Sequence, residues 1–252
     1  MALLPASVVT VLIQACLNGS RRPGDHPALP VTAAELAEDA VRVTREGTGQ
    51  LHVHPRGPEG AESLEAGACG DALLAIRRAC PGVPVGLSTA AWIEPDPERR
   101  QANIASWMER PDYVSVNFAE EGAEDLCRLL GRLGIGIEAG VWTLTDAEVL
   151  VASGFSRHLV RVLVEPQETV PAEAEATADR ISAALDRADV RPRLFHGSGI
   201  ATWRVIEYGL AGAWDVRVGL EDTLVLPDGT PASGNLDLAR AVIRMAAHRR
   251  LV

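Results

Sequence analysis

Two histidines separated by one residue are the strongest chemical signal in this sequence. His52 and His54 flank Val53 in a short run that has the character of a strand. Alternate residues of a strand point to the same side, so both imidazoles can bind one metal ion. Glu221 or Glu138, each near the end of another predicted strand, could supply a third ligand, and such a set favours zinc with open positions for substrate oxygens. A solvated or capping role for the two histidines is the alternative.

A second charged cluster is Arg217-Val218-Gly219-Leu220-Glu221-Asp222, at the end of the last predicted strand. A carboxylate beside a metal ion and a guanidinium can act as a general base, because the guanidinium sets its pKa and its orientation. Asp222 is therefore the candidate base, and Arg217 is its partner. An ion-paired rim without catalytic function is the competing interpretation.

The elements that must position these residues alternate along the chain. Short β-branched runs are followed by longer segments of helical period, which favours parallel strands joined by right-handed crossovers. The predicted strands are 8–14, 50–54, 83–88, 113–117, 135–138, 158–164, 193–196 and 214–220. The first predicted helix begins after Thr32, which forms a capping box with Glu35. The other predicted helices are 66–80, 96–109, 121–133, 143–153, 171–188, 200–211 and 235–249.

Eight strand–helix units in 252 residues predict an α/β fold of the (β/α)8 TIM barrel type, with 1–252 as a single catalytic domain. A doubly wound open sheet is the alternative, but the turn after the first strand has no G-x-G-x-x-G motif. In a barrel, catalytic groups gather at the carboxyl ends of the strands. The polar residues at the predicted strand ends are Asn18, His52, His54, Ser88, Thr89, Ser115, Asn117, Glu138, Glu165, His196, Glu221 and Asp222.

The composition of the chain excludes several kinds of binding partner and of catalytic chemistry. The net charge of −10 argues against a nucleic-acid groove, which needs clustered positive charge. All 24 basic residues are arginine, which excludes a Schiff-base lysine and a Walker-type lysine. No apolar run is long enough for a membrane span and none resembles a signal peptide, so we expect a cytoplasmic protein without a membrane partner. The four cysteines lie far apart and are expected to be reduced, small apolar fillers.

In this combination and order, the motifs resemble the β-keto acid cleavage enzyme family, which includes the 3-keto-5-aminohexanoate cleavage enzymes. The resemblance covers most of the chain. The segments that carry it are Asn18-Gly19, 26–32 (His-Pro-Ala-Leu-Pro-Val-Thr), 51–56 (Leu-His-Val-His-Pro-Arg), Ser88-Thr89, 115–118 (Ser-Val-Asn-Phe), Glu138 and 217–222 (Arg-Val-Gly-Leu-Glu-Asp).

The resemblance implies a zinc-dependent barrel that reacts a β-keto acid with acetyl-CoA and releases acetoacetate and a new acyl-CoA. It implies that His52, His54 and Glu221 bind the zinc ion, and that Asp222, supported by Arg217, is the base. It also implies a homo-oligomer, specifically a tetramer. The residues expected to contact the substrate are Ser88, Thr89, Ser115, Asn117, Glu138 and Arg21.

Two positions depart from the family pattern. Members with an amino-bearing substrate carry a Glu shortly after the first strand's glycine, where this chain has Ser20 and Arg21. We therefore expect a cationic substrate to be disfavoured, with Arg21 favouring a neutral or acidic tail. The glycine-rich turn 196–199 is of a kind that binds phosphate in barrels. However, Ile200 follows Gly199 where a basic or polar residue is expected, which weakens the prediction that this turn binds a CoA phosphate.

Two other functions stay open on the sequence alone. A different zinc enzyme on the same scaffold, such as an aldolase or hydrolase, would use the same three ligands but need no CoA. A metal-binding protein without catalysis, such as a ligand sensor, would need neither Asp222 nor Arg217. Dependence on acetyl-CoA separates the first alternative from the function that the resemblance implies.

Overall fold

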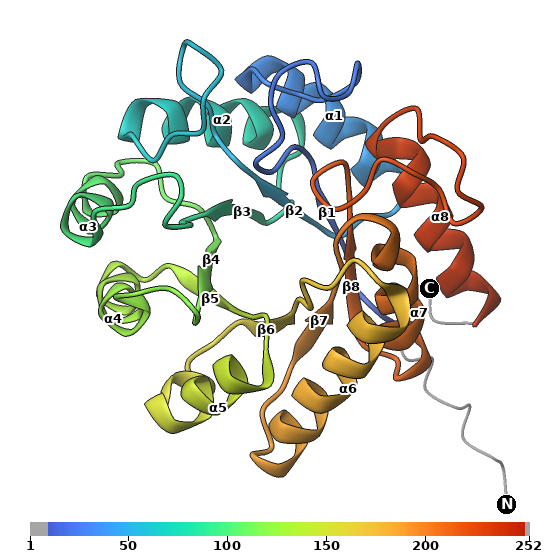
Figure 1. The fold of residues 1–252 in the computed structure, drawn as a ribbon. Coiled ribbons are helices and arrows are strands. Elements are labelled where there is room, and N and C mark those ends of the chain that lie inside the picture. Colours follow the sequence, from blue (N-terminus) through green and yellow to red (C-terminus); the bar gives the residue numbers. More distant parts are fainter. Residues whose placement is uncertain (1–9, 250–252) are drawn as a thin grey trace, which may run out of the picture.

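Eight parallel strands close into one barrel in the computed structural model, which describes residues 10–249 (Figure 1). Each strand pairs with the next in the chain, and β1 pairs with β8 to close the barrel. The strands are β1 (Ile13–Cys16), β2 (Gln50–Val53), β3 (Val85–Ser88), β4 (Tyr113–Asn117), β5 (Gly136–Val141), β6 (Arg161–Val164), β7 (Arg193–Phe195) and β8 (Asp215–Val218). This topology confirms the predicted (β/α)8 barrel and excludes the open sheet.

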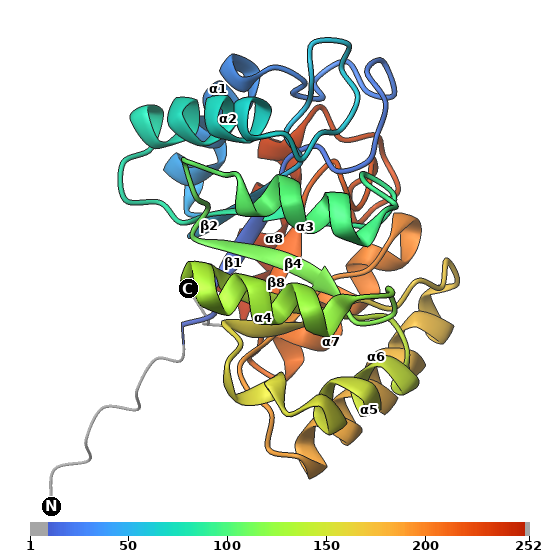
Figure 2. The same ribbon diagram turned by 90° about the vertical axis from the view of Figure 1, so that its left-hand side faces the viewer.

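A helix follows each strand and lies outside the barrel (Figures 1 and 2). The helices are α1 (Ala33–Glu46), α2 (Ala66–Ala79), α3 (Pro97–Ala105), α4 (Ala123–Leu133), α5 (Leu144–Ser153), α6 (Pro171–Arg187), α7 (Thr202–Ala211) and α8 (Asn235–His248), with short 3-10 turns η1 (Phe155–Arg157) and η2 (Gly199–Ala201). The predicted capping box before α1 is present, because Thr32 and Glu35 each accept a hydrogen bond from the other's backbone amide. No helix within 10–249 is long and apolar enough to cross a membrane.

The observed limits differ from the predicted ones in most elements, and two of the largest differences have identifiable reasons. Val8 and Val9 lie outside the described residues, and β1 starts only at Ile13. The amide of Leu12, just before it, donates to Oδ1 of Asp215 at 2.9 Å instead of to a neighbouring strand. The helix predicted over 96–109 ends at Ala105, because Trp107 turns into the core and is 2% exposed.

The inside of the barrel is more polar than its hydrophobic strand sequences indicate. Gln14 donates to Oε1 of Glu138 at 2.9 Å, and Arg161 forms an ion pair with the same oxygen at 3.1 Å. Tyr113 joins this group and donates its hydroxyl to the carbonyl of Leu51 at 2.6 Å. The apolar strand residues instead belong to the core cluster shared with the helices. The polar layer inside the barrel forms the floor beneath the strand ends.

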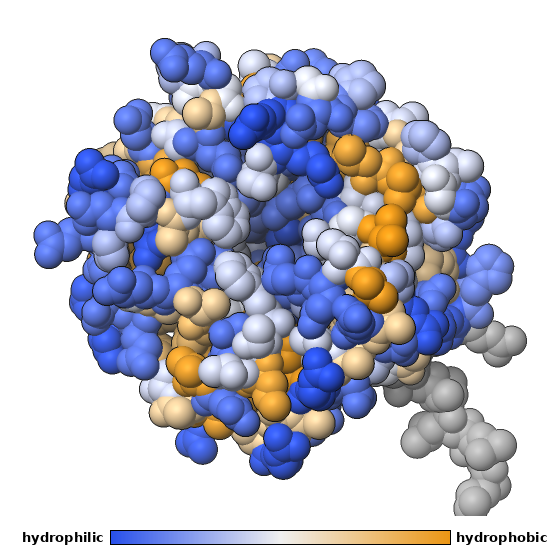
Figure 3. Space-filling view, in the orientation of Figure 1, coloured by the Kyte–Doolittle hydropathy of each residue, from blue (hydrophilic) through white to orange (hydrophobic). Residues whose placement is uncertain are grey.

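The carboxyl ends of the strands face the viewer in Figure 1, and the arrowhead of β4 in Figure 2 points to that same side. The middle of this face is hollowed and largely hydrophilic in the space-filling view (Figure 3). Active sites of this fold lie on this face, built from the strand ends and the loops that follow them. The hollow is therefore the expected location of an active site.

Candidate active site

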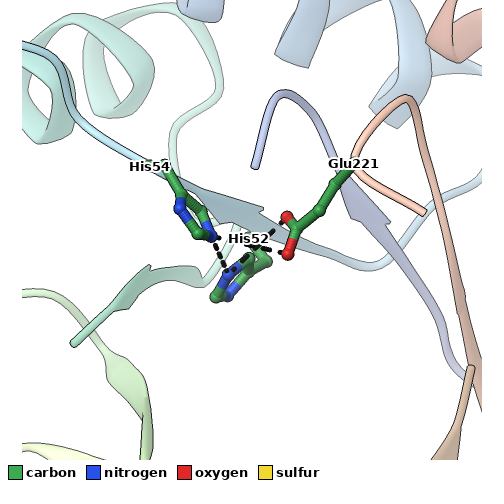
Figure 4. A group of neighbouring side chains, drawn as sticks. All are labelled: His52, His54 and Glu221. Carbon is green, nitrogen blue, oxygen red and sulfur yellow. Dashed lines mark hydrogen bonds and ion pairs between the residues drawn. The ribbon is translucent and has the colours of Figure 1, made fainter. Parts of the chain in front are cut away.

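His52, His54 and Glu221 point toward one another across the ends of β2 and β8 (Figure 4). The Nε2 atoms of His52 and His54 are 3.1 Å apart. Glu221 places Oε2 3.8 Å from Nε2 of His52 and Oε1 3.4 Å from Nε2 of His54. One donor atom from each residue lies within 4.8 Å of the others, and Oε2 of Glu221 is buried without a hydrogen-bond partner among the described residues. The group therefore fits a metal ion bound by two imidazoles and one carboxylate.

The charge states of this group also suit a metal ion. Burial lowers the pKa of His52 well below its usual value, so this imidazole is neutral. Burial acts to raise the pKa of Glu221, but Arg217 and the two histidines outweigh it and hold that pKa well below its usual range. For His54, burial acts downward, whereas Glu221 and Glu62 together raise the pKa to about 9. A metal ion at His54 would therefore displace a proton, as is usual for metal binding.

Two neighbours orient His54, and neither role was visible in the sequence. Glu62, in the loop before α2, lies with Oε1 2.5 Å from Nδ1 of His54. Asn18 accepts from the amide of His54 at 2.9 Å and donates to its carbonyl at 2.9 Å. A carboxylate on the far nitrogen of a ligating histidine fixes the ring and raises its basicity. Asn18 was expected only as a polar residue at a strand end, and nothing in the sequence marks Glu62.

The loop after β1 packs directly against Glu221. Gly19 has a φ of +58°, and a Cβ at this position would overlap Cγ of Glu221. The guanidinium of Arg21 donates to the carbonyl of Leu220, and its Nη2 to the carbonyl of Glu221 at 3.4 Å. Arg56 in turn donates to the carbonyls of Gly19 and Arg21 at 2.8 and 2.5 Å. Arg21 therefore lies at the site and holds the backbone that carries Glu221.

Asp222 lies beside the metal-binding group, in the turn after β8. Nη2 of Arg217 donates to Oδ1 of Asp222 at 3.0 Å and also to Oε1 of Glu221. Burial acts to raise the pKa of Asp222, but the charges of Arg217 and His196 outweigh it and lower that pKa. An ionised carboxylate at this position, next to a metal-binding group, has the arrangement of a general base. The structure therefore brings together the five residues predicted as ligands, base and partner.

Four of the six residues predicted to contact substrate lie on β3 and β4 or directly after β3, and three of these four side chains have hydrogen-bond partners in the protein. Oγ1 of Thr89 donates to the carbonyl of Ser115 at 2.6 Å. Nδ2 of Asn117 donates to Oε1 of Glu120 at 2.8 Å. Ser88 is 2% exposed and accepts weakly from the amide of Ala90 at 3.4 Å. Their contact with substrate stays a prediction.

Glu138, on β5, pairs with Ser115 in the strand register but is more completely buried than the other predicted substrate contacts. It is 0% exposed, and its Oε1 is bound by Gln14 and Arg161 in the polar floor. Burial raises its pKa, against the opposing charge of Arg161. These partners explain the buried carboxylate without a substrate, and a substrate role for Glu138 stays a prediction. Among Glu138 and Glu221, the geometry selects Glu221 as the third member of the metal-binding group.

The glycine-rich turn after β7 supports Asp222. The amide of Gly199, one of those expected to face an anion, donates to the carbonyl of Asp222 at 2.7 Å. Oγ1 of Thr202 lies 3.4 Å from the same carbonyl and 3.0 Å from that of Gly197. This use of the Gly199 amide disfavours the predicted phosphate-binding role of the turn.

The sequence profile of the β-keto acid cleavage enzyme family matches residues 10–251. The chain belongs to this family. The residues that carry the match include the whole barrel and all of the site described above. Membership confirms the resemblance that the His-Val-His and Arg-Val-Gly-Leu-Glu-Asp segments indicated.

One relative agrees with this family assignment, and two solved structures of lower identity show the fold alone. The 3-keto-5-aminohexanoate cleavage enzyme of Fusobacterium nucleatum is 25% identical over 256 residues, covering 94% of this chain and 91% of that protein. The structure of ObcA without ligand has a TM-score of 0.72 and 16% identity, covering 88% of this chain. The same match covers 62% of the ObcA chain. Type I 3-dehydroquinate dehydratase from Clostridium difficile has a TM-score of 0.63 at 8% identity, covering 96% of this chain and 94% of that one, and shares the fold alone.

Proposed function

We propose that this chain, acting as one catalytic domain over residues 1–252, reacts a β-keto acid with acetyl-CoA to give acetoacetate and a new acyl-CoA. The observation that carries the proposal is the placement of Asp222 and Arg217 beside the His52-His54-Glu221 group in a member of this family. The name of the Fusobacterium relative supports β-keto acid cleavage. Assembly as a homotetramer and location in the cytoplasm are part of the same expectation.

In this proposal, His52, His54 and Glu221 hold a zinc ion, which supplies polarisation of the substrate's keto oxygen. Asp222 takes the proton from the α-carbon, and the electron pair of that C–H bond stays on the substrate as an enolate. The enolate carbon attacks the thioester carbonyl of acetyl-CoA. The CoA thiolate expelled by this attack then adds to the substrate's keto carbon. A retro-Claisen split of the bond between that carbon and the α-carbon gives the new acyl-CoA and the enolate of acetoacetate, which takes back the proton held by Asp222. Arg217 keeps the Asp222 carboxylate ionised and fixes its orientation toward the substrate. Ser88, Ser115 and Asn117 are proposed to bind the keto acid.

The deciding experiment measures acetoacetate from purified, metal-analysed protein with acetyl-CoA and a panel of β-keto acids. We expect acetoacetate only when acetyl-CoA is present, with about one zinc per chain. Cleavage of a panel member without acetyl-CoA would instead favour an aldolase or hydrolase on the same site. Protein that binds no zinc would remove the basis for the metal-dependent mechanism.

Gly19→Ala is expected to weaken metal binding. The new Cβ would overlap Cγ of Glu221, and the φ of +58° disfavours any side chain here. Displacement of Glu221 is expected to lower zinc affinity about 10- to 100-fold, the loss that is typical when a residue that orients a metal ligand is mutated. Zinc affinity is measured by competition with a chromogenic chelator. The matched control is Gly24→Ala, at a φ of +96° in the same loop but with nothing within 4 Å of the added Cβ. Equal affinities in the two variants would refute the role of Gly19.

The position of Arg21 gives a prediction on substrate charge. Its guanidinium is held at the carbonyls of Leu220 and Glu221, so its positive charge stays at the site. A cationic substrate tail there would be repelled, at a cost of about 1 kcal/mol, or roughly fivefold to tenfold in kcat/KM. We expect neutral or dicarboxylic β-keto acids to react faster than an amino-bearing one, and Arg21→Ala to reduce the difference. Arg22→Ala, at the exposed neighbouring position, is the control. Faster turnover of the amino-bearing acid by the unaltered enzyme would show the prediction to be wrong.

A further inference from the structure

Arg217 is not the only residue that contacts the carboxylate of Asp222 among the described residues. The thiol of Cys16, at the end of β1, donates to Oδ2 of Asp222 at 2.7 Å. Nδ1 of His196, directly after β7, lies 3.5 Å from Oδ1. Each carboxylate oxygen therefore faces a group from a different strand that neighbours β8 in the barrel. Cys16 was expected to be an apolar filler, and its hydrogen bond to Asp222 corrects that expectation.

Both groups are shielded from solvent and are hydrogen-bond donors at neutral pH. Cys16 is 0% exposed and His196 is 1% exposed. Burial, followed by the charge of Asp222, raises the pKa of the Cys16 thiol well above its usual value, so the thiol keeps its hydrogen. Burial and Arg217 act to lower the pKa of His196, but Glu165 and Asp222 outweigh them and raise it to about 9. An imidazolium donates from both ring nitrogens.

Glu165 fixes the ring of His196 from the other side. Its Oε2 lies 3.5 Å from Nε2 of His196, while Nδ1 of the same ring faces Asp222. The imidazolium is thus placed between two carboxylates, which leaves its ring one favourable orientation. The backbone of Asp222 is held as well, through the amide of Gly199. Side chain and backbone of Asp222 are therefore both constrained by the turn after β7.

We propose that Cys16 and His196 are positioning residues that hold the carboxylate of Asp222 in one rotation and leave one acceptor position, on Oδ2, for the substrate proton. An ionised carboxylate offers about two acceptor positions per oxygen. Oδ1 faces Arg217 and His196, whereas Oδ2 faces only the Cys16 thiol among the described residues. In the step concerned, the α C–H bond breaks, its electron pair stays on the substrate, and the proton bonds to Oδ2. This assignment rests on the proposed function, because it needs Asp222 to be the base.

The test follows the proton-transfer step alone. Each β-keto acid of the panel is incubated with zinc-loaded enzyme in D2O without acetyl-CoA, and exchange of its α-hydrogens above the non-enzymatic rate is followed by NMR. Acetoacetate formation with acetyl-CoA is measured on the same samples. For Cys16→Ala, we expect the rate of exchange and kcat to fall about tenfold or more, with KM and zinc content unchanged, because a hydrogen bond to a charged group is lost. Cys16→Ser, which keeps a donor, is expected to recover most of the loss.

Cys69→Ala is the matched control, because Cys69 is equally buried but lies on α2, away from Asp222. For His196, Asn retains a donor near the place of Nδ1, so His196→Asn is expected to exchange faster than His196→Ala. A Cys16→Ala enzyme that exchanges at the unaltered rate, or a Ser variant no better than Ala, would overturn the positioning role even if acetoacetate forms. Exchange without acetoacetate would overturn acyl transfer while leaving the positioning role supported. Absence of exchange in the unaltered enzyme would overturn the positioning role, and absence of acetoacetate as well would overturn the proposed function with it.

Discussion

Asp222→Asn is expected to lower the rate of acetoacetate formation about 10³-fold while zinc remains bound, in line with the loss of a general base. Asn has the shape of Asp and keeps an oxygen for Arg217 and His196, but its amide cannot take a proton from carbon. The three metal-binding side chains are unchanged, so the metal content should stay at the level of the unaltered enzyme. The measurement is kcat together with zinc per chain. The expected signature is a fall in kcat without a matching rise in KM.

The control for this variant is Asp228→Asn, which removes an exposed carboxylate from the loop that follows the same strand. It should have the activity of the unaltered enzyme. If Asp222→Asn retained more than about a tenth of the activity, Asp222 would not be the base. If Asp222→Asn lost zinc, the Asp222 carboxylate would be needed to keep Glu221 in place, because Arg217 donates to both side chains.

Removal of the metal is expected to have an equally large effect. Chelated enzyme should fall to the background rate of acetoacetate formation, and about one equivalent of zinc per chain should restore it. Without a cation, Glu221, His52 and His54 remain in contact, but nothing polarises the keto oxygen of the substrate. Zinc should also raise the midpoint of thermal unfolding, since ligand at about 1,000 times its Kd stabilises a native state by about 4 kcal/mol.

His52→Ala tests the same site without a chelator. It should lose both zinc-dependent stabilisation and activity, because two donors hold the ion far less tightly than three. His158→Ala is the control, since this histidine is exposed and lies before β6, far along the chain from the ligands. Full activity in chelated protein, or in His52→Ala, would show that the reaction needs no metal at this site.

Much of the fold could be predicted from periodicity, because each strand–helix unit is a local pattern. Eight such units, with polar residues at the strand ends, were enough to predict the barrel and its active face. Limits of elements were less predictable where a side chain far along the chain decides them. Trp107 ends α3 by packing inward, and Asp215 binds the amide of Leu12 before β1 starts.

The sequence by itself predicted the two metal-binding histidines and the candidate base, and it left Glu221 and Glu138 as alternatives for the third ligand until the family resemblance implied Glu221. His52 and His54 share one side of a strand, and Arg217, Glu221 and Asp222 follow within a few residues of one another. The tertiary structure decided which groups surround them. Cys16 meets Asp222 across 206 positions of sequence, and Glu62 reaches His54 from an irregular loop. Closure of the barrel places β1 and β7 on either side of β8, and that contact is long-range, so no local pattern reveals it. The same closure turns Gly199 toward Asp222, which gives the glycine-rich turn a supporting role that its sequence did not indicate.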